Sequence, residues 1–229
     1  LTILIGDARI ELQAIPESTI QCCVTSPPYW GLRSYGTEPL IWTTDQACEH
    51  VWGNRLPSHH PGQVEQTKYK EANAAGRAGN TGSGNVCQIC QGWKGHLGLE
   101  PIHDCLAWAR NESPCCLCYV CHLRIIFAEV SRVLKKNGTL WLNLGDSYAG
   151  YHGTKDQEYK ANKKSHFLEN MRASTVGIGK LKPKDLVGIP WRVALALQSD
   201  GWYLRTDIIW HKANSLPESV RDRPTRSHE

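Results

Sequence analysis

The sequence has no apolar stretch that approaches the roughly 18–20 residues needed for a helix to cross a bilayer. Its first residues, LTILIGDARIEL, lack the basic flank and the small-residue cleavage site of a secretory signal. It also lacks a strong charge of either sign, because the net charge is +4. This mild basic bias permits a nucleic-acid partner without requiring one. We therefore expect a globular protein located in the cytoplasm.

The arrangement of apolar residues predicts an α/β fold. Residues 2–5 and 19–25 have the composition of strands, and residues 8–15 between them have apolar positions at helical spacing. This strand–helix–strand order is typical of a parallel sheet. Regular patterns return later in the chain and predict helices at 122–136 and 185–201 and strands at 139–146 and 202–212.

Residues 43–121 differ from both flanks, because they hold eight of the ten cysteines and many glycines without a clear period. We therefore predict three parts: a first part of a catalytic core at 1–42, a loop-rich insertion at 43–121, and a second part of the core at 122–229. Residues 149–184 form a basic loop within this last part, with eight basic and three acidic side chains. Such a run is either a solvated loop or a lid over a phosphate backbone.

Ten cysteines in a reducing compartment are more typical of metal ligands than of disulfides. Two groups have the spacing of tetrahedral zinc sites, and either ion would be structural. The alternative is that these cysteines are buried or idle thiols, and we expect Cys22 and Cys23 to be core residues of their strand. His122 is a spare ligand candidate. The two predicted ligand groups are Cys48, His50, Cys87 and Cys90, and Cys105, Cys115, Cys118 and Cys121.

The stretch VTSPPYW, residues 24–30, leaves a predicted strand through two successive prolines. Prolines have no N–H, so the backbone here offers carbonyl acceptors, and Ser26 adds a hydroxyl. Two such acceptors can orient a primary amino group on an aromatic ring, while Tyr29 stacks on the face of that ring. A base in a duplex must be flipped out to reach such a pocket. The alternative is a proline-rich turn that caps a strand.

The chain resembles the amino-group DNA methyltransferases that carry an S-P-P-Y or D-P-P-Y motif. The motif itself, FAEVSRVLKKNGTLWLNLGDSYAG and the region from DLVGIPWRV onward resemble consecutive blocks of that family, in the family's order. The resemblance implies a Rossmann-like core that transfers a methyl group from S-adenosylmethionine to N4 of cytosine or N6 of adenine in double-stranded DNA. S-P-P-Y leans towards cytosine without excluding adenine.

The resemblance also assigns roles to individual residues. It implies that Ser26, Pro27, Pro28 and Tyr29 form the catalytic target-base pocket, and that Ser26 and Pro27 also adjoin the cofactor. Asp7 falls where an acidic residue of the family lies near the adenosine of the cofactor. Asp146 follows a predicted strand and is an unassigned polar group. For both aspartates the alternative is a carboxylate that caps a turn.

One family motif is missing, because the F-x-G-x-G turn that binds the methionine half of the cofactor does not occur. In the subclass that places S-P-P-Y first, this turn follows the blocks found here, so we expect a truncated enzyme that binds cofactor poorly by itself. Two alternatives remain open: a non-enzymatic zinc module that binds nucleic acid, and a methyltransferase that acts on RNA or on a protein amide.

Overall fold

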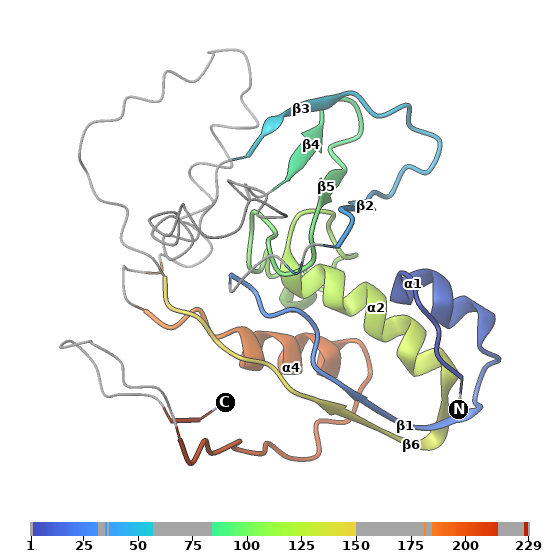
Figure 1. Ribbon diagram of the computed structural model, residues 1–229, viewed down its shortest axis with the longest axis vertical. Coiled ribbons are helices and arrows are strands. Elements are labelled where there is room, and N and C mark those ends of the chain that lie inside the picture. The colour runs from blue at the N-terminus through green and yellow to red at the C-terminus, as the bar shows by residue number, and fades with distance from the viewer. Residues whose placement is uncertain are drawn as a thin grey trace, which may run out of the picture.

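The computed structural model describes residues 2–31, 35, 37–56, 84–149, 181, 185–214 and 227–228 (Figure 1). The predicted basic loop at 149–184 therefore lies almost wholly outside the described residues, as does the polar centre of the predicted insertion. None of the helices among the described residues is long and apolar enough to span a membrane.

Two parallel strands form the base of the fold. Strand β1 (Ile20–Thr25) pairs with β6 (Leu134–Leu142), and Thr25 lies opposite Leu142 at their carboxyl ends. Both strands were predicted from sequence, but β6 begins earlier than expected. The preceding helix ends at Val133, and Leu134 already has the extended φ of −73° and ψ of 142°. Lys135 and Lys136, which we expected at the end of a helix, therefore belong to the strand.

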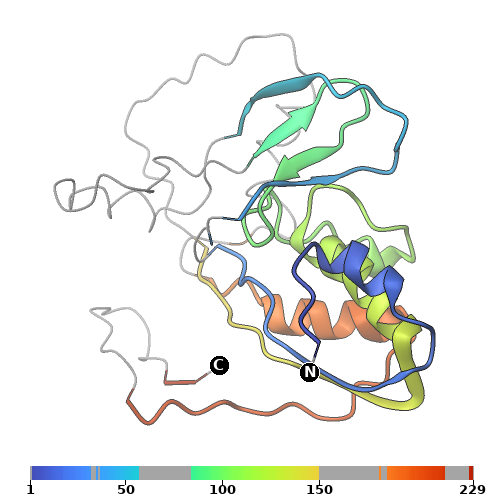
Figure 2. The same cartoon turned by 45° about the vertical axis from the view of Figure 1, so that its right-hand side comes forward.

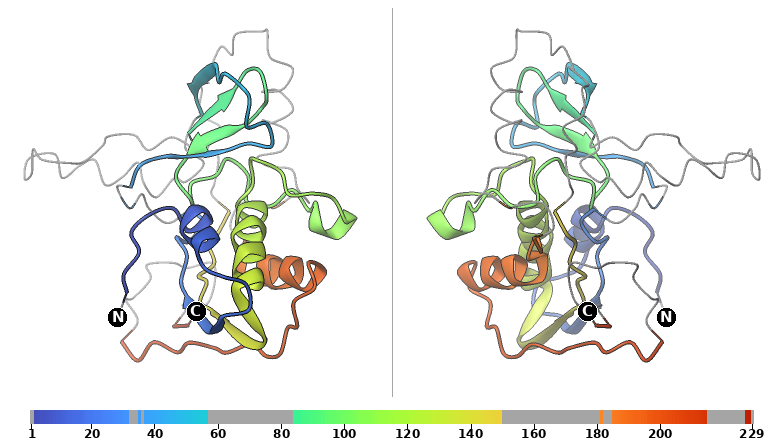
Figure 3. Two further views of the ribbon diagram at one scale, coloured as in Figure 1. Left: turned by 90° about the vertical axis from the view of Figure 1, so that its right-hand side faces the viewer. Right: turned by 90° about the vertical axis from the view of Figure 1, so that its left-hand side faces the viewer.

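Helices α2 (Tyr119–Val133) and α4 (Ile189–Ser199) cross each other and pack against the strand pair (Figure 3). Leu123, Phe127 and Val130 recur at three- and four-residue steps on α2 and are buried, as the sequence predicted. Arg124 of α2 binds both carboxylate oxygens of Asp200 just beyond α4, at 2.6 and 2.7 Å. The two helices are thus joined by an apolar contact and a bidentate ion pair.

A short helical segment lies beside α2 near the start of the chain. It consists of α1 (Ala8–Glu11) and the 3₁₀ turn η1 (Leu12–Ala14), where a single helix was predicted for 8–15. Arg132 of α2 donates to the carbonyls of Leu12 and Ile15, at 2.8 and 3.1 Å. These bonds tie the end of the short helical segment to α2, and the Leu12 carbonyl also accepts from the N–H of Ile15 at 3.0 Å.

The predicted insertion supplies three strands of a small antiparallel sheet, which Figure 2 shows above the helices, and the fourth strand, at 40–42, lies just before the predicted boundary. Its core is formed by Trp42, Leu56, Val86 and Trp93. We expected a loop-rich insertion without a clear period, because strands this short show no measurable alternation of apolar and polar residues. A 3₁₀ turn, η4 (Trp108–Arg110), follows the sheet. In spatial order the strands are β2 (Leu40–Trp42), β5 (Trp93–Gly95), β4 (Asn85–Cys87) and β3 (Trp52–Arg55).

Three predictions from apolar sequence were wrong. The strands predicted at 2–5 and 202–212 are absent from the described residues, where 202–212 has only an isolated bridge between His211 and His228. The side chains of Ile5 and Ile209, which fit a strand pattern, are 92% and 63% exposed. Cys22, expected in the core, is exposed on β1. For the two segments, the physical reason is that an apolar pattern specifies a strand only when a partner strand lies alongside to complete the ladder.

Candidate active site and metal centres

The S-P-P-Y loop lies at the carboxyl ends of the two parallel strands. Ser26 directly follows β1, and the backbone N–H of Asn143, which follows β6, donates to the carbonyl of Thr25 at 3.0 Å. Ser26 is exposed, and Pro27, Pro28 and Tyr29 are half-buried. In α/β folds, ligands bind outside this edge of a parallel sheet. The four predicted residues thus lie together at a solvent-accessible edge.

The ring of Tyr29 lies against Gly145, which follows β6. A Cβ atom on Gly145 would lie 2.6 Å from Cδ2 of the tyrosine ring, so only glycine leaves room for the ring in this position. The hydroxyl of Ser26 donates to the hydroxyl of Tyr29 at 3.4 Å. The two predicted functional side chains are therefore neighbours.

Three hydrogen bonds hold the loop from the side of the predicted insertion. The buried Tyr119 hydroxyl donates to the carbonyl of Pro28 at 2.8 Å. The indole of Trp30 donates to the carbonyl of Glu100 at 3.2 Å, and the N–H of Gly31 donates to the carbonyl of Gly98 at 2.8 Å. None of these three partners was predicted from sequence. They lie 67 or more residues from the loop along the chain, and an isolated tyrosine, glutamate or glycine carries no signal of such a contact.

Both predicted aspartates have structural partners. Asp7 caps α1 by accepting from the N–H of Arg9 at 2.9 Å, and it forms an ion pair with the Arg9 side chain at 2.5 Å. Burial opposes the charge on Asp7, but the hydrogen bonds and charge of Arg9 prevail and hold its pKa below the ordinary value. Asp146 accepts from the N–H groups of Gly188 and Ile189, both at 3.0 Å, at the start of α4. Both carboxylates thus act as helix caps.

The first predicted metal group forms a cluster between the strands of the antiparallel sheet. Its four ligand atoms all lie within 4.8 Å of one another. Sγ of Cys48 is 3.9 Å from Sγ of Cys87, and Sγ of Cys90 is 3.4 Å from Nδ1 of His50. Thiolates about 2.3 Å from a tetrahedral zinc ion lie about 3.8 Å apart, so these separations fit that ion.

Two thiols of this cluster have pKa values that are shifted in opposite directions. Burial and the neighbouring thiols Cys90 and Cys87 raise the pKa of Cys48 to about 12. Burial also opposes ionisation of Cys87, but the N–H groups of Cys90 and Ile89 and the His50 side chain lower its pKa to about 6. The groups around Cys87 therefore favour its thiolate, and a bound cation would favour ionisation of Cys48 as well.

The second predicted metal group is also assembled, at the start of α2. The sulfurs of Cys105, Cys115, Cys118 and Cys121 lie within 4.8 Å of one another. Sγ of Cys105 is 3.5 Å from that of Cys121 and 3.6 Å from that of Cys118. Cys118 is also the N-cap of α2, because its sulfur accepts from the N–H of Cys121 at 3.3 Å.

His122 does not face either cluster. Its Nδ1 lies 2.9 Å from Oε1 of Glu100 and its Nε2 lies 3.0 Å from the carbonyl of Cys116, and both members of the His122–Glu100 pair are fully buried. The spare ligand candidate is therefore engaged in a buried polar network.

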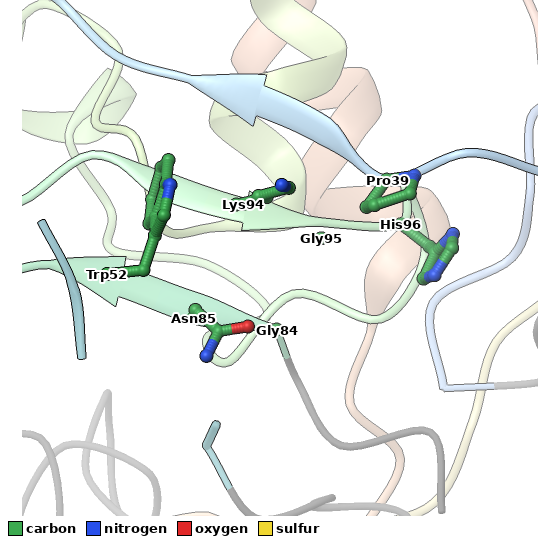
Figure 4. Close-up of a pocket in the computed structure, with 7 residues that line it drawn as sticks. All are labelled: Pro39, Trp52, Gly84, Asn85, Lys94, Gly95 and His96. Atoms are coloured by element: carbon green, nitrogen blue, oxygen red, sulfur yellow. The ribbon is translucent and has the colours of Figure 1, made fainter. Parts of the chain in front are cut away.

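A shallow pocket of about 370 Å³ opens on the antiparallel sheet (Figure 4). Trp52, Asn85, Lys94 and His96 contribute side chains to it, and the Lys94 ammonium lies 5.9 Å from the centre of the Trp52 ring. No residue of the S-P-P-Y loop lines it. The pocket is separate from the candidate active site.

The chain is similar to several Type II methyltransferases along its whole length. It is 38% identical over 229 residues to the Type II methyltransferase M.SmaI of Serratia marcescens, and the match covers 99% of the chain and 53% of that protein. It is 37% identical to M.XycI of Xanthomonas campestris pv. cyanopsidis and 35% identical to M.Cfr9I of Citrobacter freundii, each over the whole chain and 52% of the relative. The chain thus spans about half the length of these relatives.

No solved structure matches the chain. A family model described as N6_N4_Mtase, DNA methylase, matches residues 20–229, which include the S-P-P-Y loop, both cysteine clusters and both packed helices. This match extends over most of the sequence. The chain therefore belongs to the N6_N4_Mtase family of DNA methylases.

Proposed function

We propose that the chain carries the target-base site of an S-adenosylmethionine-dependent methyltransferase. Its substrate is an exocyclic amino group in double-stranded DNA, N4 of cytosine or N6 of adenine, and it acts in the cytoplasm. The observation that carries the proposal is the position of Ser26–Tyr29 at the carboxyl ends of β1 and β6, with Ser26 exposed. The names of the relatives, Type II methyltransferases, support the reaction class.

In this proposal the residues of the loop act on the target base. The Ser26 hydroxyl and the Pro27 carbonyl accept hydrogen bonds from the amino group and orient its nitrogen lone pair. Tyr29 covers one face of the ring, a contact worth about 1–3 kcal/mol per base. When bound, S-adenosylmethionine supplies an electrophilic methyl group. Ser26 and the Pro27 carbonyl would hold the amino nitrogen towards that methyl group, and the proton displaced from the nitrogen would pass to water at this exposed edge.

The described residues fit only part of a cofactor site. The side chain of Arg9 binds both carboxylate oxygens of Asp7, at 2.5 to 3.1 Å, so this aspartate is engaged where the resemblance implies a contact to adenosine. Ser26 and Pro27 remain at the open edge. We therefore assign only the methyl end of the cofactor to this edge and rest no step on Asp7.

The test compares Ser26→Ala and Tyr29→Ala with the unchanged protein, each produced from its complete reading frame. We expect loss of the hydroxyl to lower kcat by about 10²–10³, as for other groups that orient a transition state. Labelled S-adenosylmethionine offered with duplex DNA, RNA and protein measures the transfer and identifies the substrate. Ser199→Ala is the control, because that exposed hydroxyl on α4 donates to Trp108 instead. Near-normal turnover in both loop variants would refute the site.

The same assay decides among the alternatives. An S-P-P-Y loop recognises a planar amino group rather than a polymer, so label in RNA or protein would assign a different substrate to the same site. No label in any of the three substrates would favour the non-enzymatic zinc module. Digestion of labelled DNA to nucleosides separates N4-methylcytosine from N6-methyladenine.

We also propose that each cysteine cluster holds one structural Zn²⁺. The donor sets, three thiols with one imidazole and four thiols, are those of closed tetrahedral zinc sites, and the separations given above fit them. The ions would hold the antiparallel sheet and the start of α2 in place. They would take no part in methyl transfer, which proceeds by direct displacement.

A further inference from the structure

We propose that Tyr119 is a positioning residue for methyl transfer. Its hydroxyl occupies the Pro28 carbonyl and so fixes which two acceptors of the S-P-P-Y loop face the target amino group. This inference rests on the function proposed above. It adds a residue that lies 90 positions beyond the motif and outside it.

The loop presents several hydrogen-bond acceptors in a row, so something must determine which of them accept from the target amino group. The carbonyls of Pro27 and Pro28 are adjacent, and neither proline has an N–H with which to form a regular turn or ladder. Tyr119 donates to the Pro28 carbonyl at 2.8 Å, whereas no donor among the described residues bonds to the Pro27 carbonyl. Of the two proline carbonyls, that of Pro27 is therefore the one left for a substrate, and it lies next to the exposed residue Ser26.

Tyr119 is itself held rigidly. It is fully buried at the first turn of α2, its N–H donates to the carbonyl of Ile102 at 3.0 Å, and the next N–H donates to the carbonyl of His103 at 3.2 Å. Cys118 and Cys121 of the second cluster flank it on the same turn. A buried ring with a fixed backbone can place one hydroxyl accurately, at low cost in side-chain entropy.

A second contact closes the loop from the same side. Gly98 has a φ of +90°, and a Cβ there would lie 2.9 Å from the Tyr29 carbonyl and 3.1 Å from the Pro28 carbonyl. The backbone at Gly98 can approach this closely only because it has no side chain. Tyr119 and Gly98 therefore confine the Pro28–Tyr29 peptide between a hydroxyl and a backbone.

The test is Tyr119→Phe in the protein of the complete reading frame, which removes a single oxygen. We expect kcat to fall about tenfold, because one orienting hydrogen bond is lost, while KM for DNA and for S-adenosylmethionine changes less than twofold. Tyr203→Phe is the matched control, since that tyrosine is 87% exposed on the segment after α4. Hydrogen exchange of residues 26–31 should accelerate in Tyr119→Phe, while exchange of α2 and α4 stays unchanged.

Gly98→Ala is a second variant, whose added Cβ would displace the Pro28 and Tyr29 carbonyls while Tyr119 stays unchanged. It should lower kcat with the same unchanged KM values. Wild-type kcat and wild-type exchange in Tyr119→Phe would overturn the inference, and so would accelerated exchange throughout α2, which would indicate a structural role only. Ser26→Ala is assayed in parallel. If Ser26→Ala and Tyr29→Ala both turn over at a near-normal rate, the proposed function fails, and the exchange experiment still decides whether Tyr119 holds the loop.

Discussion

At the scale of single residues, the His122–Glu100 pair joins parts of the chain that are distant in sequence. The His122 ring stacks on Trp42 of β2, with centroids 3.8 Å apart, and its nitrogens contact Glu100 and the Cys116 carbonyl. Glu100 also accepts from the N–H of Gly98 at 2.8 Å. The pair therefore connects the antiparallel sheet and α2 to the segment that contacts the S-P-P-Y loop.

We predict that Glu100→Ala lowers the free energy of unfolding by about 3–5 kcal/mol, because it leaves His122 and the Gly98 N–H buried without their partner. Urea denaturation measures the change. The matched control is Glu112→Ala, which removes the carboxylate of an ion pair with Arg110 whose side chains are about half exposed. That variant should unfold at nearly the wild-type urea concentration. Equal midpoints for the two variants would show that the buried pair does not stabilise the fold.

Only part of the candidate site could be predicted from sequence, because some of its residues carry a local signal and others do not. Ser26–Tyr29 could be proposed as a site because the relevant side chains and carbonyls lie in four adjacent residues. The cysteine groups could be proposed because C-x-x-C spacing is a local signal. Tyr119 and Gly98 were missed, since their roles arise only from contacts made across the fold. For Asp7, the sequence left two roles equally open, a cofactor ligand and a helix cap. The hydrogen bond from the N–H of Arg9 shows that it caps α1.

At the scale of elements, the antiparallel sheet has little apolar core of its own. Its strands have three or four residues, and four buried side chains form its cluster. A sheet this small buries too little apolar surface to offset the entropy of ordering its loops. The cluster of Cys48, His50, Cys87 and Cys90 lies where it can cross-link the connections between β2 and β3 and between β4 and β5.

We predict that the purified protein contains two zinc ions per chain by elemental analysis. Cys90→Ser should remove one ion and make β2–β5 sensitive to limited proteolysis, because the sheet loses its cross-link. Cys121→Ser should remove the other ion and affect the start of α2 instead. Cys22→Ser is the control, since that exposed thiol belongs to neither cluster. Full zinc content in both cluster variants, or a metal-free wild-type protein, would contradict the proposal.

Long helices with a regular apolar pattern were predicted well, and short strands were not. Helices α2 and α4 bury apolar residues over three or more turns, so their patterns are unambiguous. Strands of three residues contain a single alternation, and β2–β5 were therefore missed. The pattern at 202–212 was strand-like, but among the described residues only its end is paired, through the isolated bridge between His211 and His228. Strand pairing is therefore a property of the fold rather than of the segment.

At the scale of the whole molecule, large apolar side chains are exposed in several regions of the described chain. Ile3 and Ile5 lie in the first segment, Val24 and Trp141 on the strand pair, and further side chains follow α4. Isolated apolar side chains are normal on a surface, but runs of them are typical of surfaces that associate. The run after α4 comprises Tyr203, Leu204, Ile208, Ile209 and Trp210.

We predict that the 229-residue polypeptide associates in solution and binds a hydrophobic dye, because this run offers apolar area to any partner. Ile209→Lys should lower dye fluorescence and shift the mass measured by light scattering towards the monomer. Thr206→Lys is the matched control, as it adds the same charge to an exposed position of the same segment while every apolar side chain remains. If both lysine variants dissociate the protein equally, net charge rather than apolar contact governs association. If the protein is a monomer and binds no dye, the exposed apolar run does not mediate association.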